Sequence, residues 1–403
     1  MVRTADSTVL ELACEPLSCV RIGMVGLGRR GVSTLKRYSA VKGVLFTALS
    51  DLHTEALMVA REAISPEQRA ADLVMYDGPE AWRQLCRDRN VDVVYICTDW
   101  ASHAEIAIDA MEQGKHVVVE VPAAMTVEQC NALVYTAEQT RRHCFMAENC
   151  SYDPFALAQK EMIEKGDLGR LTHLEGGYLH DLRQIFAETS RITGECSWME
   201  KDWLQHAGNP YPTHGIGSLG LALGLHRGDR MVRVVSMTSK MDHDGGGKTN
   251  SSLIYTELGR TLLLQINLNT PQPYNRLQRV VGSRGYASKY PIPVVQTVEM
   301  PEALSGDEAI EYMKRYLTGP AAMKVVEGQH MGVHNAMNYA MDARFIYCLQ
   351  HGLPLDLDVY DAAEWSCLTE LTAKSAAHGG APVDIPDFTH GHWHELSGHR
   401  FYE

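Results

Sequence analysis

The chain has 403 residues, of which 45% are hydrophobic and 22% charged, and its formal net charge at pH 7 is -13. That length allows two domains with separate cores, and no apolar run is long enough to cross a bilayer, so we expect no membrane as a partner. An acidic chain is also a poor match for nucleic acid, which binds basic surfaces.

The ten cysteines show no CxxC pair and no Cys/His spacing typical of a metal site. We therefore expect reduced thiols, no metal and a cytoplasmic location. Residues 1–20 are interpreted as an N-terminal extension rather than a signal peptide, because Glu11 and Glu15 interrupt its apolar stretch. The histidine-rich run 390–395 is expected to be ordinary surface.

The first part of the chain alternates between two kinds of segment. Short, nearly continuous apolar runs, as expected of strands buried on both faces, occupy residues 21–28, 43–51, 91–99 and 115–122. Amphipathic stretches separate them, such as 102–114, for which Ser102 is the expected N-cap and Gly114 the residue after the end. The alternation predicts an α/β Rossmann domain over 21–150, with a doubly wound parallel sheet.

A glycine motif follows the first of these strands directly. Its glycines are Gly26, Gly28 and Gly31. In a strand–turn–helix, this spacing lets the backbone approach a pyrophosphate that lies on the helix N-terminus. Asp51 ends the second strand 20 residues later, where a carboxylate accepts hydrogen bonds from the adenosine ribose and repels a 2′-phosphate. The pattern predicts NAD rather than NADP, although Arg29 and Arg30 can accommodate the extra phosphate.

Residues 151–403 follow a different pattern, typical of antiparallel strands with one face on a core. Alternating runs occupy 171–181, 231–241, 251–258, 260–268 and 275–283, and helices are expected at about 306–316, 330–351 and 359–377. The pair 259–260 predicts a tight hairpin. We expect an α+β substrate domain with an open, mostly antiparallel sheet, whose exposed face makes a homo-oligomer plausible.

Two polar turns are candidate parts of a site. Trp100 and His103 follow the strand at 91–97, where they either line a nucleotide or cap a helix. The stretch GNPYPTHGIG (208–217) holds Tyr211 and His214 between prolines and glycines that stiffen the turn. Glu148 either binds a sugar hydroxyl or is a buried acid at a strand end.

The chain resembles the glucose–fructose oxidoreductase/inositol dehydrogenase superfamily (Gfo/Idh/MocA), in a Rossmann domain with GxGxxG, the strand GKHVVVEVPAA and an open-sheet domain. That superfamily usually carries Glu-Lys-Pro at the strand end, where the lysine serves hydride transfer. Here the segment reads Glu120-Val121-Pro122, and the missing lysine counts against a simple alcohol dehydrogenase.

The resemblance is closer to the NAD-dependent glycoside hydrolases of family 109, whose known activity is α-N-acetylgalactosaminidase. It rests on EVPAA, TDWASH, ENCSYD, GGY, GNPYPTHG, PYNR and LPLDLDVYDAAEWS with VDIPDF. It implies NAD contacts from Arg29, Arg30, Asp51, Trp100, Ala101, Ser102, His103, Glu120, Val121, Asn149 and Tyr211. It implies a sugar site of Glu148, Tyr178, Tyr211, Pro212, Thr213, His214 and Tyr290, with Tyr286 competing for the last place.

The chemistry implied by this resemblance is a redox route to hydrolysis, an exception to the usual pair of carboxylates. NAD oxidises C3 of the sugar, a base removes the acidified C2 proton, the aglycone leaves, water adds and C3 is reduced again. His214, Tyr211 and Tyr178 are the candidate acid/base groups, with their individual protons unassigned. A helix after His214 would disfavour its imidazolium, so we expect that base to be neutral.

One departure bears on the sugar. The family often has an arginine after the tryptophan that precedes the YPTH segment, whereas this chain reads Trp198-Met199, with Lys201 nearby. The substrate is therefore predicted as an N-acetylgalactosaminide or a related hexosaminide or hexoside. The alternatives are an NAD-dependent sugar or cyclitol dehydrogenase of the superfamily and a non-catalytic NAD-binding sensor.

Overall fold

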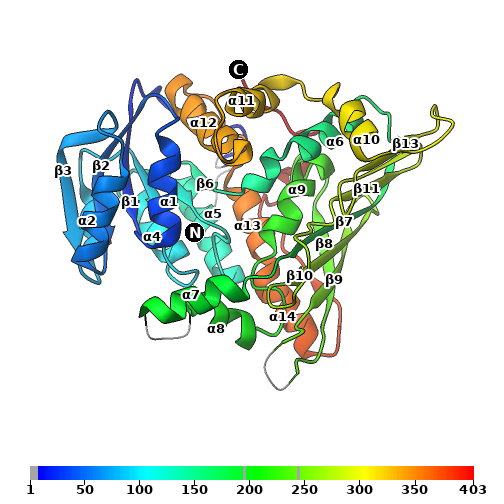
Figure 1. The fold of residues 1–403 in the computed structure, drawn as a ribbon, viewed down its shortest axis with the longest axis horizontal. Coiled ribbons are helices and arrows are strands. Elements are labelled where there is room, and N and C mark those ends of the chain that lie inside the picture. Colours follow the sequence, from blue (N-terminus) through cyan, green and yellow to red (C-terminus); the bar gives the residue numbers. More distant parts are fainter. Residues whose placement is uncertain (1–7, 194–196, 243–245) are drawn as a thin grey trace.

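The protein contains two sheets with helices packed between and around them (Figure 1). The structure is a computed structural model and describes residues 8–193, 197–242 and 246–403. The first seven residues of the expected N-terminal extension lie outside this described part. No helix within these ranges is long and apolar enough to span a membrane.

The first sheet is fully parallel, in the order β3-β2-β1-β4-β5-β6. Its strands are β1 Val20–Val25, β2 Val44–Asp51, β3 Arg69–Asp77, β4 Val93–Ile96, β5 His116–Val119 and β6 Cys144–Met146. Its helices are α1 Arg29–Tyr38, α2 Thr54–Ala63, α3 Ala81–Arg87, α4 His103–Glu112 and α5 Val127–Thr140. The predicted doubly wound Rossmann sheet is confirmed.

Two strands of this sheet were not predicted, for different reasons. β3 is an edge strand with mostly exposed or half-buried residues, so its sequence lacks a continuous apolar run. β6 has only three residues, all buried, which is too short to show any period.

The second sheet has nine strands in the order β14-β13-β12-β11-β7-β10-β9-β8-β15. They are β7 Leu171–Leu179, β8 Met231–Thr238, β9 Asn250–Thr256, β10 Thr261–Asn267, β11 Arg279–Gly282, β12 Gly285–Ser288, β13 Val294–Thr297, β14 Leu304–Ser305 and β15 Val383–Asp384. Among the described strands of this sheet only the β7–β10 pair is parallel, which confirms a mostly antiparallel sheet. Gly259, at φ +77°, closes the predicted hairpin between β9 and β10.

One predicted strand begins later than expected. The run 275–283 is extended only from Arg279, because Leu277 and Gln278 adopt positive φ values of 59° and 51°. Left-handed residues break the extended backbone that a ladder needs. The turn just before β11 instead carries Asn275 back to Leu179, with two main-chain hydrogen bonds of 2.9 Å.

The remaining helices surround the second sheet and return to the first. They are η1 Asn149–Tyr152, α6 Pro154–Glu164, α7 Arg183–Thr193, α8 Trp198–Gln205, α9 Thr213–Leu223, α10 Gly306–Lys314, α11 Gly319–His330, α12 Ala336–His351, α13 Val359–Ser366, α14 Leu368–Ala377 and η2 His392–His394. The helix predicted over 330–351 is α12 alone, and the one predicted over 359–377 is two helices that meet at Cys367.

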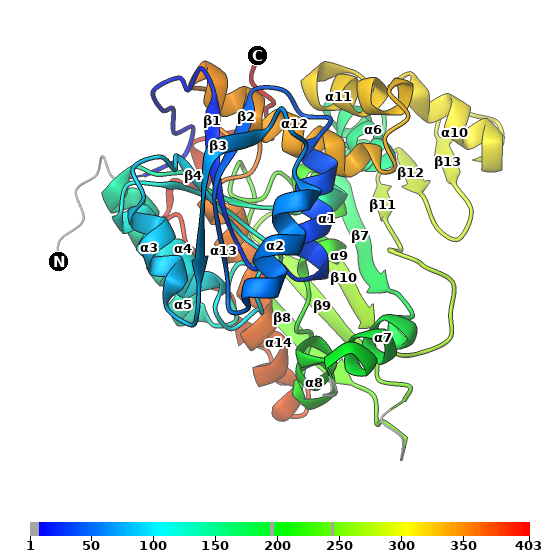
Figure 2. The same cartoon turned by 60° about the vertical axis from the view of Figure 1, so that its left-hand side comes forward.

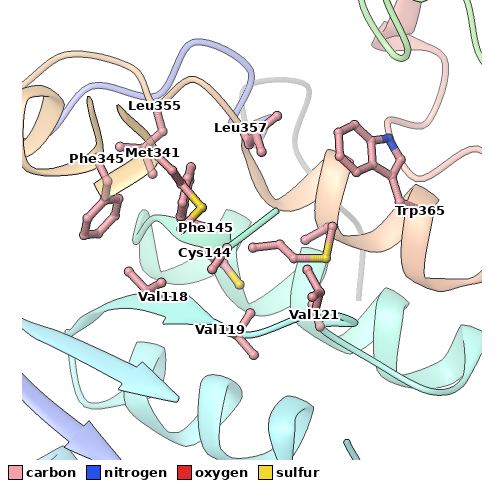
Figure 3. Packing of buried hydrophobic residues seen from close by; sticks show 14 of the residues in the cluster. Val118, Val119, Val121, Cys144, Phe145, Met341, Phe345, Leu355, Leu357 and Trp365 are labelled. Carbon is pink, nitrogen blue, oxygen red and sulfur yellow. The ribbon is translucent and has the colours of Figure 1, made fainter. Parts of the chain in front are cut away.

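The C-terminal helices pack on the edge of the first sheet. Figure 3 shows side chains of β5 and β6 facing those of α12, with Trp365 of α13 at the far end of the same cluster. Phe145 of β6 and Phe345 of α12 have ring centroids 5.1 Å apart. The largest hydrophobic core therefore continues from the first sheet into the end of the chain. The division into units at residue 150 stays a prediction.

A smaller hydrophobic cluster holds the helical segment between β7 and α9. Leu182, Phe186, Trp203, Ile266 and Leu268 form it, and Tyr178, Met199 and Tyr211 pack against it. Figures 1 and 2 show α7 and α8 beside β10 and α14. This segment carries Met199 and Trp198 to the region of Tyr178 and Tyr211.

Candidate active site

The glycine loop between β1 and α1 is shaped by close backbone contacts. A Cβ on Gly26, whose φ is +86°, would lie 2.6 Å from the carbonyl oxygen of Cys97, and a Cβ on Gly31 would lie 2.1 Å from that of Gly26. A Cβ on Gly28 would meet nothing within 4 Å. Two glycines are thus needed to build the loop, whereas Gly28 leaves one side open for a ligand.

The first turn of α1 presents main-chain N–H groups to that open side. Gly28 is the N-cap and offers no side chain to cap them, and Arg29 and Arg30 follow. Asp51, at the end of β2, accepts hydrogen bonds from the main chain of Leu27 (2.7 Å) and His53 (3.0 Å). An uncapped helix N-terminus with adjacent arginines and a strand-end carboxylate fits the pyrophosphate and ribose of a dinucleotide.

The loop before α4 places its two aromatic candidates in buried positions. Trp100 is 2% exposed and stacks on Tyr211, with ring centroids 5.4 Å apart and planes 23° apart. His103 is buried, with Nδ1 2.8 Å from the Pro122 carbonyl and Nε2 3.2 Å from the Thr98 carbonyl. Burial lowers the pKa of His103. His103 therefore ties this loop to the end of β5, whereas Asp99 and Ala101 of the loop are exposed.

Ser102 occupies the predicted N-cap position of α4, but the expected side-chain cap is wrong. Its hydroxyl lies 2.8 Å from the Thr98 hydroxyl and 2.9 Å from Asp99 Oδ1, and it makes no hydrogen bond to the helix N-terminus. The competing partners within the loop satisfy the hydroxyl first. Gly114 has the positive φ, +79°, expected after the helix end.

The remaining predicted nucleotide contacts lie at strand ends of the same sheet. Glu120 accepts a 2.7 Å hydrogen bond from Arg30 Nε, and Val121 is buried in the core of Figure 3. Asn149 donates from Nδ2 to Asn338 at 2.6 Å. Arg30 and Asn149 both come to the carboxyl edge of the sheet, where ligands of doubly wound folds bind.

The turn that carries Tyr211 and His214 is held by Asn209. Its Oδ1 accepts from the main chain of Tyr211 at 2.9 Å, and its own N–H donates to Thr372 of α14 at 2.9 Å. Pro212 is the N-cap of α9, so the helix predicted after His214 already begins at Thr213. Thr213 is fully buried, while the Tyr211 and His214 side chains remain partly accessible.

A chain of hydrogen bonds runs from a buried acid through this turn. Glu148, 0% exposed, faces His214 Nδ1 with its two oxygens at 2.8 and 2.9 Å. His214 Nε2 lies 3.1 Å from the Tyr211 hydroxyl. Burial lowers the pKa of His214, but nearby Cys150 and Glu148 outweigh it and raise that pKa to about 10. His214 lowers the pKa of Glu148 in turn, against the effect of burial.

The prediction of a neutral His214 is therefore wrong. A helix N-terminus acts on a nearby charge with about 0.3–1 kcal/mol and at most about 2. A carboxylate about 4 Å away contributes about 4 kcal/mol at an effective dielectric of 20. Cys150 and the Glu148 carboxylate, which touches the ring, therefore outweigh both burial and the helix N-terminus. At pH 7 His214 is an imidazolium that donates to Glu148 from Nδ1 and to the Tyr211 oxygen from Nε2.

A second phenol–imidazole pair lies against the first. The Tyr178 hydroxyl is 2.9 Å from His180 Nδ1, and the Tyr178 ring meets the His214 ring edge-on at 4.8 Å. Burial and the charge of His214 both lower the pKa of His180. Burial raises the pKa of Tyr178 and of Tyr211. The site thus combines a cationic histidine and a neutral one, each bonded to a protonated phenol.

Tyr290, rather than its competitor, belongs to this aromatic group. Its ring lies 6.2 Å from Tyr274, which contacts Tyr178 at 6.1 Å. Tyr286 instead packs under the Arg279 guanidinium. The buried Arg276 lies 5.9 Å from both the Tyr274 and the Tyr290 rings.

Three residues that were not predicted lie at the site. Cys150 places its sulfur within 4.8 Å of the polar atoms of Glu148 and His214. His180 and Tyr274 meet edge-on at 5.0 Å. His180 follows Tyr178 by two residues, a spacing that puts both side chains on one side of an extended strand, so this signal was available. Cys150 and Tyr274 belong to the motifs ENCSYD and PYNR, but no regular spacing to the other candidate residues marks them in the sequence.

The comparisons with known proteins cover nearly the whole chain. Residues 20–148 match the oxidoreductase family with an NAD-binding Rossmann fold, and residues 152–244 and 242–395 match the glycosyl hydrolase 109 C-terminal domain. A Bacteroides fragilis protein named α-N-acetylgalactosaminidase is 44% identical, across 98% of this chain and 97% of that protein. A glycosyl hydrolase family 109 protein of Phocaeicola vulgatus is 45% identical, across 96% and 98%.

Solved structures share the fold at lower identity. Levoglucosan dehydrogenase in complex with NADH has a TM-score of 0.70 at 20% identity, covering 91% of this chain and 99% of that one. An inositol dehydrogenase homologue from Azotobacter vinelandii with NAD+ has a TM-score of 0.70 at 18% identity, covering 93% and 100%. The first domain therefore has the Gfo/Idh/MocA fold, and NAD is its cofactor.

The open side of Gly28 gives a test of where NAD lies. Gly28 has φ -67°, so Gly28→Ala fits the backbone and should leave the melting temperature within about 2 °C of wild type. The added methyl would meet the pyrophosphate, so we expect NAD affinity to fall at least about tenfold, which is about 1.4 kcal/mol. Fluorescence titration with NAD measures this.

Gly166→Ala serves as the control, because a Cβ there also meets nothing within 4 Å, although its φ of +81° makes some loss of stability expected. Unchanged NAD affinity in Gly28→Ala would show that the pyrophosphate does not lie against this glycine.

Proposed function

The chain belongs to glycosyl hydrolase family 109, and we propose that it hydrolyses α-N-acetylgalactosaminides at the site around His214. The observation that carries this proposal is the chain Glu148–His214–Tyr211 beside the pair Tyr178–His180. The first group, the cationic arm (Glu148, His214 and Tyr211), supplies a hydrogen-bond donor. The second group, the neutral arm (Tyr178 and His180), supplies a proton acceptor. A glycosidase that works through a transient ketone needs both.

The residues that we propose for NAD are those predicted from the sequence. Gly28 and the first turn of α1 would hold the pyrophosphate, and Asp51 the adenosine ribose. Bound NAD supplies reversible oxidation of a sugar hydroxyl. Trp100 and His103 shape the loop at the carboxyl end of β4, with both His103 nitrogens facing main-chain carbonyls.

The neutral arm fits the removal of a proton. A C–H next to a ketone is acidic because its carbanion is an enolate, and an acceptor must lie beside it. We assign this role to Tyr178, whose oxygen takes the C2 proton while its own proton passes to His180 Nδ1, 2.9 Å away. His180 can accept that proton because its lowered pKa keeps it neutral at pH 7.

The cationic arm fits the stabilisation of negative charge. The His214 imidazolium donates to the Tyr211 oxygen, so the Tyr211 O–H is left to donate outward. A polarised phenol of this kind is a strong donor to an enolate oxygen, and buried donors act more strongly than donors in water. Glu148 holds the imidazolium in place and keeps it charged.

The competing functions differ in what they release. A sugar dehydrogenase would discharge NADH with a keto product, and the buried Val121 in place of the superfamily lysine counts against it. A non-catalytic sensor has no need of two opposed phenol–imidazole pairs.

Met199 packs beside Tyr178 and Tyr211 in an apolar cluster, so it offers the sugar an apolar wall and no charge.

We also propose a cytoplasmic homo-oligomer. The outward side of the second sheet exposes Met237, Leu253 and Tyr255, which are 49–61% accessible and suit contact with another copy. Free thiols at the cysteines in the described ranges fit a reducing compartment. Sedimentation as a monomer at micromolar concentration, or recovery of the protein outside the cytoplasm, would contradict these two points.

The proposed reaction is tested by hydrolysis of an aryl α-N-acetylgalactosaminide in D2O. The wild type should release the aglycone, place deuterium at C2 of the sugar and accumulate no NADH. Tyr178→Phe should lower deuterium incorporation and kcat at least about 100-fold, the lower end for an acid–base group. Tyr286→Phe, whose ring lies on Arg279, is the matched control and should match wild type. Formation of NADH in proportion to substrate loss, without release of the aglycone, would contradict the proposal.

The charge of His214 predicts a pH dependence. Because its pKa is raised to about 10, the protonated form that the reaction uses persists through neutral pH and is lost as pH rises through about 10. Glu148→Gln removes one of the two groups that raise this pKa, Cys150 being the other, so the pKa of His214 should fall. The loss of kcat with rising pH should then occur at a lower pH in Glu148→Gln than in wild type.

The control for this pH profile is Glu175→Gln, which changes a carboxylate on β7 that is paired with Arg279. Its kcat should follow the wild-type curve. Identical profiles for wild type and Glu148→Gln would exclude the proposed role of the Glu148 carboxylate.

A further inference from the structure

An exposed indole lies one ring away from the reacting groups. Trp198, at the start of α8, is 42% exposed and meets the buried Trp100 edge-on, with centroids 5.1 Å apart. Trp100 in turn stacks on Tyr211 at 5.4 Å. Three aromatic rings therefore lead from the phenol of the site to solvent. A single exposed apolar residue is ordinary on a surface, but this one contacts the ring that stacks on Tyr211.

Two acidic residues neighbour these indoles along the chain. Asp202 lies four residues after Trp198 on α8, a spacing that puts both on one face of the helix. Asp99 lies beside Trp100 in the loop before α4 and is exposed, with Oδ1 accepting from Ser102. Burial, and then the charge of Asp99, raise the pKa of Asp202, so the two acids are near enough to interact. Each carboxylate has about four acceptor positions.

The helix that carries Trp198 is anchored at its C-terminal end. The buried Lys248 donates from Nζ to the carbonyls of Trp203, Leu204 and His206 at the C-terminal end of α8. Trp203 is 0% exposed and lies in the small hydrophobic cluster under the segment. A cation at a helix C-terminus stabilises that end. The helix that carries Trp198 is therefore anchored at its C-terminal end before any ligand binds, which lowers the entropy cost of binding.

We propose that Trp198, Asp202 and Asp99 form a subsite for a pyranose ring of the aglycone. The apolar C–H face of the ring would lie on the indole, and its hydroxyls would donate to the two carboxylates. An aromatic wall with a few placed polar groups is the usual composition of a small-ligand site. The subsite rests on the proposed function, because it binds the part of the glycoside that leaves. It implies that glycosides with a sugar aglycone are the preferred substrates.

The experiment compares two substrates with one enzyme. The methyl α-N-acetylgalactosaminide and a disaccharide with the same N-acetylgalactosamine on galactose share everything except the ring in the subsite. Trp198→Ala should raise the KM of the disaccharide about tenfold or more and that of the methyl glycoside less than twofold. Trp198→Phe should restore most of the loss, and Asp202→Asn should act in the same direction as Trp198→Ala. Trp82→Ala, on α3 away from the site, is the control.

A binding measurement keeps the inference separate from the reaction. Titration of the NAD-loaded protein with free methyl galactoside should quench tryptophan fluorescence in wild type and not in Trp198→Phe. A protein that releases no sugar but shows this quench would contradict the proposed function and retain the subsite.

Equal KM changes for both glycosides would overturn the subsite. So would a loss of NAD affinity in Trp198→Ala with unchanged preference for the disaccharide, since that result would place a ribose of the cofactor on the indole.

Discussion

The buried ion pair between Glu148 and His214 is the contact on which the rest of the site depends. A carboxylate with 0% exposure costs several kcal/mol to remove from water, and only a close, hydrogen-bonded cation offsets that cost. His214 Nδ1 at 2.8 Å and the main-chain N–H of Cys150 at 2.9 Å together satisfy the Glu148 oxygens. The pair joins the end of the first sheet to the helix α9 that follows the YPTH turn.

Close packing around α9 makes this pair possible. A Cβ on Gly217 would lie 2.3 Å from Cγ of Glu148, and a Cβ on Gly176 would lie 2.2 Å from the carbonyl oxygen of Gly215. Glycines therefore let α9 approach both Glu148 and strand β7. The same approach sets the Tyr178 ring against the His214 ring. Gly176 of the GGY motif and Gly217, three residues after His214, thus serve the geometry of the site beside the tyrosine and histidine themselves.

The sequence predicted those parts of the molecule that are encoded locally. The glycine loop, the acid at the end of β2 and the hairpin at Gly259 depend on residues close in sequence, and each lies where its pattern indicates. The charge of His214 was mispredicted because it is set by Cys150 and by Glu148, the latter 66 residues earlier in the chain. The sequence around His214 predicts the helix N-terminus, but it does not predict the stronger contact with Glu148.

Other differences have the same origin in tertiary contacts. Ser102 has the composition of a capping residue, yet Thr98 and Asp99 take its hydroxyl. The start of β11 is delayed by two left-handed residues that nothing in their side chains requires. The spacing of His180 two residues after Tyr178 does not give its role, which depends on the 2.9 Å contact of its Nδ1 with the Tyr178 hydroxyl. The periodicity of the sequence predicts single helices and strands, whereas the site is formed by residues from several of them.

Nitrogen NMR of the labelled His214 imidazole measures directly whether Glu148 and Cys150 keep this ring positively charged at neutral pH. We expect both ring nitrogens to carry protons at pH 8 and the ring to titrate near pH 10. A ring that is neutral at pH 8, with one unprotonated nitrogen, would contradict the assignment of a cationic donor arm to Tyr211 and His214.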